Sequence, residues 1–324
     1  MSTGLLRPDN LNIEFVLLAI LLVATTERTM RSYIRDATRR INDPGMGLPR
    51  LTYSVNMDKI GEDLRSKFIE FDCDDETQQF LDSCFDTGVY HMITSMLSTV
   101  LNVFYSVTDT NGMLNRGQMF VFSHAQAARL LNFPDGRCGG KLLDIGAGDG
   151  NVTAKLATFV DTVYATEVSM PMVRALNAKG FNATHTTDLT HPDIVAHGPY
   201  DFISLLNVLD RADTPLTLLR QIHSLLTPNG VVLIAVVLPF SAFVEVGTQK
   251  LPPTEMLPMK GGLCADRDCF EDAARIMATM VFGSSGFDVR AFSRVPYLCR
   301  GDISQPYYVL HDALFTLKKS SSDF

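Results

Sequence analysis

The segment LLDIGAGDG, residues 142–150, constrains the fold of this chain more than any other stretch of its sequence. An apolar run leads into three closely spaced glycines, Gly146, Gly148 and Gly150, and the residues after them favour a helix. Glycine lets a backbone turn sharply and approach a ligand without a Cβ atom in the way. In open α/β sheets, ligands bind outside the carboxyl ends of the strands, where such turns lie. The segment therefore predicts a strand, a ligand-binding turn and a helix.

An acidic residue, Asp144, stands two positions before the first of these glycines. The dinucleotide fingerprint Gly-x-Gly-x-x-Gly cradles a pyrophosphate, which a carboxylate at this position would repel. The same carboxylate suits S-adenosylmethionine, which carries an ammonium group and no phosphate. We therefore expect S-adenosylmethionine as cofactor rather than a nicotinamide dinucleotide, with Asp144, Gly146 and Gly148 binding it. A structural turn without a ligand is the alternative.

Two further acids fall at the expected ends of the next two strands. Glu167 follows the run TVYAT, and an acid about 20 residues after a glycine loop accepts hydrogen bonds from ribose hydroxyls. Asp188, in HTTDLT, falls where the third strand should end, and we expect it to accept from the adenine amino group. For Glu167 the alternative is a surface acid that caps the following helix.

From Lys141 onward, apolar runs of strand length alternate with helix-like segments. This alternation predicts a doubly wound, mostly parallel sheet. We expect an α/β, Rossmann-like fold of the class I S-adenosylmethionine-dependent methyltransferases, with seven strands and an N-terminal helical extension. The expected strands include 141–147, 162–168, 201–208, 230–238, 289–296 and 307–317, and the expected helices include 152–159, 170–178, 215–226 and 268–281.

The remaining chain divides by composition. Residues 41–55 contain prolines and glycines and predict a linker. Residues 56–135 are expected to form the helical extension, because apolar residues recur at helical spacing over 56–110 and Ser123 is placed to cap a helix. Residues 136–319 are expected to be the methyltransferase domain, with a Pro- and Gly-rich insertion at 240–266 and a short tail at 320–324.

The first 40 residues predict targeting or membrane association. Residues 15–24, FVLLAILLVA, are uninterrupted and apolar, but a membrane-spanning helix needs about 20 such residues. Arginines at 28, 31, 35 and 39 share one face of a helix, and a basic amphipathic helix suits an anionic membrane surface. The alternative is a buried N-terminal helix with a solvated arginine face.

Charge and cysteine content narrow the function classes. The net charge is −8, with 28 basic and 36 acidic residues, which argues against nucleic acid as the main partner. Of the six cysteines, Cys264 and Cys269 are close in sequence, and no second pair completes a zinc pattern. We expect no metal and a monomeric catalytic domain.

The fourth expected strand ends in SLLNVLDR, residues 204–211, and polar groups that emerge there would face the methyl donor. Asn207 and Asp210 are three positions apart, so a turn or short helix directs both toward one site. An ion pair between Asp210 and Arg211, or a helix cap, is the alternative for the acid.

Several motifs together resemble the DREV family of methyltransferase-like proteins. They are LLDIGAGDGNVT, VYATEVS, LLNVLDRADTPLTLLRQIHSLL, VVLPF, MLNRGQMFVFS and the tail RVPYLCRGDISQPYYVLHDALFTLK. Members of that family are protein-histidine methyltransferases associated with the endoplasmic reticulum. They methylate the pros nitrogen of histidine in His-x-His stretches whose middle residue is small. The resemblance implies the same reaction, cofactor, substrate proteins and location here.

The resemblance also assigns cofactor positions. Asp144, Gly146 and Glu167 match residues of the family that bind the cofactor. Tyr297 matches a residue that closes over it.

Substrate positions follow in the same way. Asn207 matches a residue near the cofactor and the target imidazole, and Asp210 matches one that faces the imidazole. Tyr308 matches a tyrosine near the substrate channel, and Arg116, in MLNRGQMFVFS, is expected to bind substrate.

The proposed reaction requires control of the imidazole tautomer. For the pros nitrogen to attack, the tele nitrogen must carry the proton. A carboxylate that accepts the tele N–H enforces this and stabilises the imidazolium, as the aspartate of a serine-protease triad does. We assign this role to Asp210, with Asn207 orienting the ring and binding the cofactor. The alternatives are a methyltransferase for another side chain or a small molecule, and a non-catalytic module that only binds the cofactor.

Overall fold

The computed structural model describes residues 49–85, 94, 97–98, 110, 114, 118–246, 249–259, 270–301 and 305–321. The expected leader and basic helix of residues 1–40, most of the linker, Arg116 and the pair Cys264 and Cys269 lie outside these residues. Within the described part of the chain, no helix is long and apolar enough to cross a membrane.

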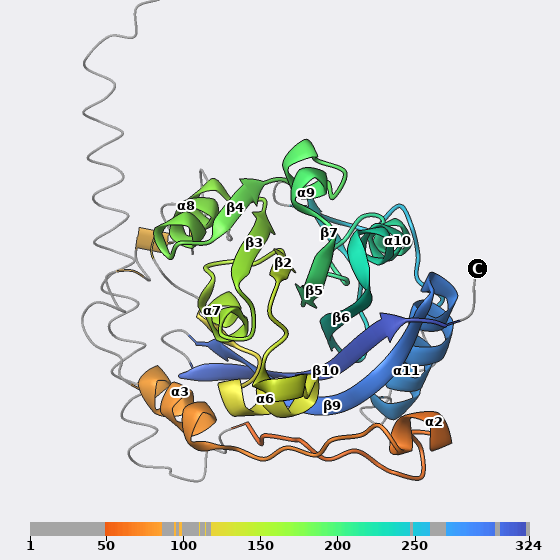
Figure 1. The fold of residues 1–324 in the computed structure, drawn as a ribbon. Coiled ribbons are helices and arrows are strands. Elements are labelled where there is room, and N and C mark those ends of the chain that lie inside the picture. The colour runs from red at the N-terminus through yellow and green to blue at the C-terminus, as the bar shows by residue number, and fades with distance from the viewer. Residues whose placement is uncertain are drawn as a thin grey trace, which may run out of the picture.

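Among the described residues, eight strands form one mixed sheet in the order β1-β9-β10-β6-β5-β2-β3-β4. The block from β6 to β4 is parallel, and β10 is antiparallel to both β6 and β9. This confirms the expected α/β, Rossmann-like fold (Figure 1). The strands are β1 Met119–Phe120, β2 Lys141–Ile145, β3 Thr162–Glu167, β4 Asn182–His185, β5 Tyr200–Leu206, β6 Leu226–Val237, β9 Phe287–Arg300 and β10 Tyr307–Lys319.

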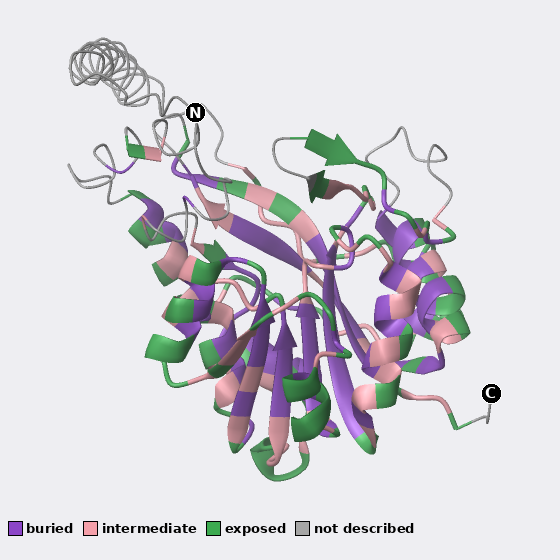
Figure 2. Ribbon diagram, turned by 90° about the horizontal axis from the view of Figure 1, so that it is seen from above, coloured by how far each residue is buried: buried purple, intermediate pink, exposed green. Residues whose placement is uncertain are grey.

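Helices cover both faces of the sheet. One core cluster joins the strands to α9 (Pro192–His197), α10 (Pro215–Leu225) and α11 (Phe270–Ile276). A second core cluster joins the opposite face to α6 (His124–Leu131) and α7 (Asn151–Ala157). The helix α8 (Met170–Ala178) packs against β3 and β4. Buried residues therefore follow the central strands, and exposed residues lie on the outer sides of the helices (Figure 2).

The sheet departs from the expected seven strands because the extension adds an eighth. Met119 and Phe120 pair antiparallel with Cys299 and Leu298 of β9. Phe120 and Leu298 are both buried in a third apolar cluster, so burial of Phe120 holds this short strand at the edge.

The expectation of helix throughout 56–110 is wrong for part of the described chain. Residues 56–85 are helical at α2 (Glu62–Arg65) and α3 (Asp75–Phe85), and the segment between them runs alongside β9 (Figure 1). Ile69 N donates to Phe292 O at 2.8 Å. In this segment Phe71 is buried and Phe68 and Ile69 are partly buried against the sheet, because tertiary contacts override local propensity.

Other boundaries differ modestly. The expected helix at 268–281 continues as a π-helix, Met277–Phe282. The insertion contains a hairpin of β7 (Val244–Val246) and β8 (Gln249–Leu251).

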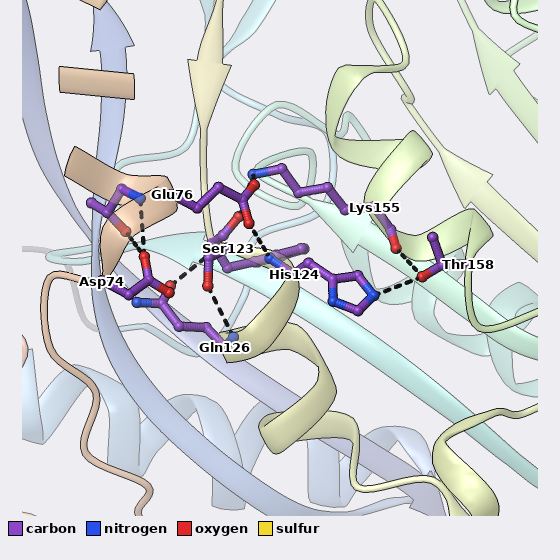
Figure 3. Close-up of polar contacts among 9 residues, drawn as sticks. Asp74, Glu76, Ser123, His124, Gln126, Lys155 and Thr158 are labelled. Carbon is purple, nitrogen blue, oxygen red and sulfur yellow. Dashed lines mark hydrogen bonds and ion pairs between the residues drawn. The ribbon is translucent and has the colours of Figure 1, made fainter. Parts of the chain in front are cut away.

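Polar contacts attach the extension to α7 (Figure 3). Ser123 and Gln126 form the capping box of α6, which confirms the expected cap. Lys155 Nζ lies 2.7 Å from Glu76 Oε1 and donates to Phe122 O at 2.7 Å. Its side chain is largely buried. The ammonium group of Lys155 on α7 therefore binds both α3 and the segment that precedes α6.

Candidate active site

The glycine loop joins β2 to α7 as expected. Gly146, Gly148 and Gly150 have φ values of 69°, 57° and 77°, a region that favours glycine. A Cβ atom on Gly146 would lie 2.6 Å from Val208 Cγ2, whereas one on Gly148 would meet no described atom within 4 Å. The backbone at Gly148 therefore faces open space, as a ligand-binding turn requires.

Glu167, the last residue of β3, is bound to this loop. Its carboxylate accepts from Gly148 N at 2.9 Å, from Val168 N at 2.7 Å and from Ser169 N at 3.0 Å. A carboxylate has about four acceptor sites, so these bonds leave capacity for a ribose hydroxyl. The structure thus brings Gly148 and Glu167 together at the carboxyl ends of β2 and β3.

Asp144 is buried beneath the loop. Its two oxygens accept from Thr153 Oγ1 and Ser204 Oγ, both at 2.6 Å. Burial raises the pKa of Asp144 to about 6, while these two hydrogen bonds oppose the rise. Both oxygens thus have partners in α7 and β5, which gives Asp144 a role in fixing the loop between these elements.

Asp188 follows β4 by three positions and is fully exposed. Its carboxylate accepts from Thr190 N at 2.8 Å and from Thr190 Oγ1 at 2.7 Å, and these bonds lower its pKa. The residue forms a local turn, and its contact with adenine stays a prediction.

Asn207 stands immediately after β5 in a left-handed conformation, with φ of 57°. Asparagine tolerates this region better than most residues. Its backbone N donates to Ala235 O at 2.9 Å. Its side-chain Nδ2 donates to Asp312 Oδ2 at 2.7 Å, and its Oδ1 is buried without a partner among the described residues.

Asp210 lies in the turn after Asn207 and is 4% exposed. Its Oδ2 is 2.9 Å from Arg211 Nη1, so the ion pair with Arg211 exists. Its Oδ1 is buried and has no hydrogen-bond partner in the described chain. Burial raises the pKa of Asp210, and the guanidinium of Arg211 opposes the rise. One oxygen is thus held by a cation and the other is free for a donor.

Asp312, in the middle of β10, was not expected at the site. It is fully buried, and burial, with Asp210 adding to it, raises its pKa to about 8 against the bond from Asn207. The available signal was an acid within the apolar strand YYVLHDALFTLK, because a charged residue in a central strand needs a partner or a function.

The two expected tyrosines lie on the ribbon of β9 and β10. Tyr297 pairs with Leu310, and Tyr308 pairs with Cys299. Side chains alternate along a strand, so Tyr308, Leu310 and Asp312 lie on one face of β10. Tyr308 and Leu310 are exposed, and Asp312 is fully buried. Tyr297 is buried and donates to Met119 Sδ, and burial raises its pKa well above the usual value.

These observations fit S-adenosylmethionine. The uncovered backbone at Gly148 and the carboxylate of Glu167 adjoin each other at the carboxyl edge of the sheet, where ligands of such sheets bind. Gly148 and Glu167 would hold the cofactor there, while Asp144 and Gly146 shape the loop beneath it, and their direct contact with the cofactor stays a prediction.

Two solved structures to which this chain is similar share little sequence with it. DhpI in complex with S-adenosylhomocysteine has 17% sequence identity and a TM-score of 0.36, over 61% of this chain and 85% of that one. The Burkholderia thailandensis 1,6-didemethyltoxoflavin-N1-methyltransferase, with its substrate and S-adenosylhomocysteine bound, has 17% identity and a TM-score of 0.40, over 72% of this chain and 92% of that one.

The model of the DREV methyltransferase family matches residues 52–319. This range includes the glycine loop, the turn with Asn207 and Asp210, and the whole of β9 and β10. The chain therefore belongs to the DREV methyltransferase family and is an S-adenosylmethionine-dependent methyltransferase.

Proposed function

We propose that this enzyme methylates the pros nitrogen of histidine in His-x-His segments of substrate proteins. The observation that carries the proposal is the state of Asp210: one oxygen is paired with Arg211, and the other is buried and unpaired among the described residues. A buried acceptor without a partner costs about 1–3 kcal/mol. Such an atom is retained where a substrate donor will reach it.

S-adenosylmethionine, when bound, supplies a methyl group on a positively charged sulfur. The chain's part is to bring the nucleophile into line, because positioning accounts for much of the rate of such a displacement. An imidazole with a pKa of about 6.5 is largely neutral at pH 7 and needs no strong base.

The role of Asp210 is to choose which imidazole nitrogen attacks. Its free Oδ1 accepts the tele N–H, which leaves the pros nitrogen with its lone pair. As the ring becomes an imidazolium, the same carboxylate stabilises the new positive charge. Arg211 holds the other oxygen at 2.9 Å, which fixes the direction of the acceptor.

A His-x-His segment suits an approach along a strand-like path. In an extended peptide, alternate side chains point to one face, so both imidazoles lie together and the middle residue points away. A small middle residue is then accepted where the opposing wall is close.

The test is mass spectrometry of peptides incubated with the full chain and labelled S-adenosylmethionine, with pros and tele methylhistidine separated. We expect label in His-Ala-His peptides, at the pros nitrogen. Free histidine, a Lys-Ala-Lys peptide and an Arg-Ala-Arg peptide serve as matched acceptors. Label mainly in lysine, in arginine or at the tele nitrogen would refute the proposal.

A further inference from the structure

Asp312 has no part in the chemistry assigned to Asp210. It nevertheless lies beside the carboxyl end of β6, opposite Val237, and is fully buried. The negative charge of Asp210 raises its pKa. Its contact with Asn207 joins positions that are 105 residues apart. A buried carboxyl group is retained in a strand only with a compensating interaction. The carboxamide of Asn207 supplies it to Oδ2, whereas Oδ1 of Asp312 is buried without a partner among the described residues.

The backbone of Asn207 is fixed independently of this contact. The left-handed φ of 57° and the bond from Asn207 N to Ala235 O at 2.9 Å set the position of its Cα atom. The carboxamide can still rotate, and a half-turn exchanges its oxygen and nitrogen. The bond from Nδ2 to Asp312 Oδ2 at 2.7 Å selects one of the two orientations.

That orientation leaves Oδ1 of Asn207 as the free atom. It is buried without a partner in the described chain, as is Oδ1 of Asp210. The two residues follow the same strand, so two oxygens from one turn are available to a ligand. An ionised carboxylate accepts hydrogen bonds and donates none, so Asp312 in its ionised form binds the amide nitrogen and rejects the amide oxygen.

We propose that Asp312 is a positioning residue for methyl transfer, which holds the Asn207 carboxamide with its oxygen toward the reacting imidazole. This inference rests on the proposed function. As the ring becomes an imidazolium, its edge gains positive charge, and an oxygen held toward it stabilises that charge more than it stabilises the neutral ring. A flipped amide would present N–H groups to the same charge and raise the barrier.

The bond persists when Asp312 changes its protonation state. Burial raises the pKa of Asp312 to about 8, so most of the population is protonated at pH 7. A protonated carboxyl group keeps acceptor capacity on its carbonyl oxygen, and Oδ2 continues to accept from Asn207 in either state. A protonated carboxyl group can also donate to the oxygen of a flipped amide, so the preference for this orientation is strongest when Asp312 is ionised.

Three variants test the proposal by turnover of a His-Ala-His peptide. Asp312→Leu removes the acceptor, and we expect kcat to fall about 10- to 100-fold, the range for one oriented group in a transition state. Asp312→Asn keeps an acceptor oxygen but adds N–H donors that also bind a flipped amide, and we expect its kcat to lie between those of Asp312→Leu and wild type. Thr316→Val is the matched control, since Thr316 is buried on the same strand, and its kcat should be unchanged.

A double-mutant cycle separates positioning from general support of the fold. Asn207→Gly removes the side chain and tolerates the positive φ. If Asp312 acts through Asn207, adding Asp312→Leu to Asn207→Gly should cause no further loss of kcat. Losses that multiply in the double variant, or wild-type kcat in Asp312→Leu, would overturn the inference.

Binding of S-adenosylhomocysteine, measured by calorimetry, provides a readout besides activity. Its affinity should stay within about threefold of wild type in the variants of Asp312, because the amide oxygen faces the imidazole; a larger loss in Asp312→Leu would contradict the inference. If Asp312→Leu does not fold, Asp312→Ala completes the same cycle. If the wild type methylates another acceptor, the proposed function fails, and the same cycle on that acceptor shows whether Asp312 acts through Asn207.

Discussion

Gly148 N donates to Glu167 Oε2 at 2.9 Å, which joins the glycine loop to the end of β3. Glutamine in place of Glu167 has a single acceptor oxygen and presents N–H groups to backbone donors. We expect Glu167→Gln to lower the free energy of unfolding by about 1–3 kcal/mol and to weaken S-adenosylhomocysteine binding by about tenfold or more. Urea unfolding and calorimetry measure the two effects. Glu62→Gln, at an exposed ion pair with Arg65, should change neither.

Gly146 and Gly148 of the loop should separate stability from binding. Gly146→Ala meets Val208 at 2.6 Å, whereas the Cβ of Gly148→Ala meets no described atom within 4 Å. Both variants strain a positive φ by about 1–2 kcal/mol, and the clash adds to the loss for Gly146→Ala. We expect Gly148→Ala to be the more stable variant and still to lose cofactor affinity, as thermal unfolding with and without S-adenosylhomocysteine will show. Wild-type affinity in Gly148→Ala would place the ligand elsewhere.

Asp210→Asn should lower turnover strongly without weakening cofactor binding. Its free oxygen, Oδ1, accepts the imidazole N–H, and an amide carries no charge to stabilise the imidazolium. We expect kcat to fall by about 100-fold or more, with S-adenosylhomocysteine affinity within about threefold. Asp135→Asn is the control, since Asp135 is exposed and already has a positive φ. Near-normal turnover in Asp210→Asn would remove that residue from the mechanism.

Asp312 should make the folded protein less stable as pH rises. Its pKa is raised from 3.8 to about 8, so between these values the unfolded chain loses a proton that the folded chain retains. The contribution to the free energy of unfolding is complete below pH 3.8 and is lost as pH rises to about 8. The loss is at most about 1.4 kcal/mol per pH unit.

Comparison with Asp312→Asn isolates this effect. Asp144 has a pKa raised to about 6, so it makes the free energy of unfolding depend on pH mainly below pH 6. It does so in both proteins. We expect urea unfolding to show a free energy of unfolding that falls more steeply with pH in wild type than in Asp312→Asn. The difference should appear between pH 6 and pH 8, the window set by these two pKa values. Parallel curves would show that Asp312 is already ionised in the folded state.

The contacts of Lys155 should hold the extension in place. Glu76→Gln leaves this largely buried cation with the carbonyl of Phe122 as its remaining strong acceptor. We expect the free energy of unfolding to fall by about 1–3 kcal/mol. We also expect the substitution to speed hydrogen exchange more in α3 than in β2. Asp82→Asn is the matched control on α3, because Asp82 contacts an exposed glutamine of the same helix. Unchanged exchange in Glu76→Gln would show that apolar packing alone holds α3.

The sheet could be predicted because its signals are local. Glycine spacing, an acid at a strand end and a continuous apolar run each depend on neighbouring residues, and β2, β3 and α8 lie within a few residues of the expected positions. The strand β1 could not be predicted, because its two residues are held by pairing with β9, more than 170 positions away.

The site divides in the same way. Asn207 and Asp210 follow one strand, and their placement at a common turn is a local property. Asp312 reaches Asn207 because β10 enters the sheet beside β6 in the reverse direction. No spacing within β10 reports that neighbour, so the partner of Asn207 required the three-dimensional arrangement.

The reversed strand also has a consequence for biosynthesis. The parallel strands, the glycine loop and the turn with Asn207 and Asp210 all precede residue 238, whereas β10 ends at Lys319. A nascent chain on the ribosome therefore possesses its cofactor residues before it possesses Asp312. Until β10 is inserted between β6 and β9, the edge of β6 stays unpaired, and exposed strand edges invite association with other chains. The step that brings Asp312 to the active site is thus also the one that covers the exposed edge of β6.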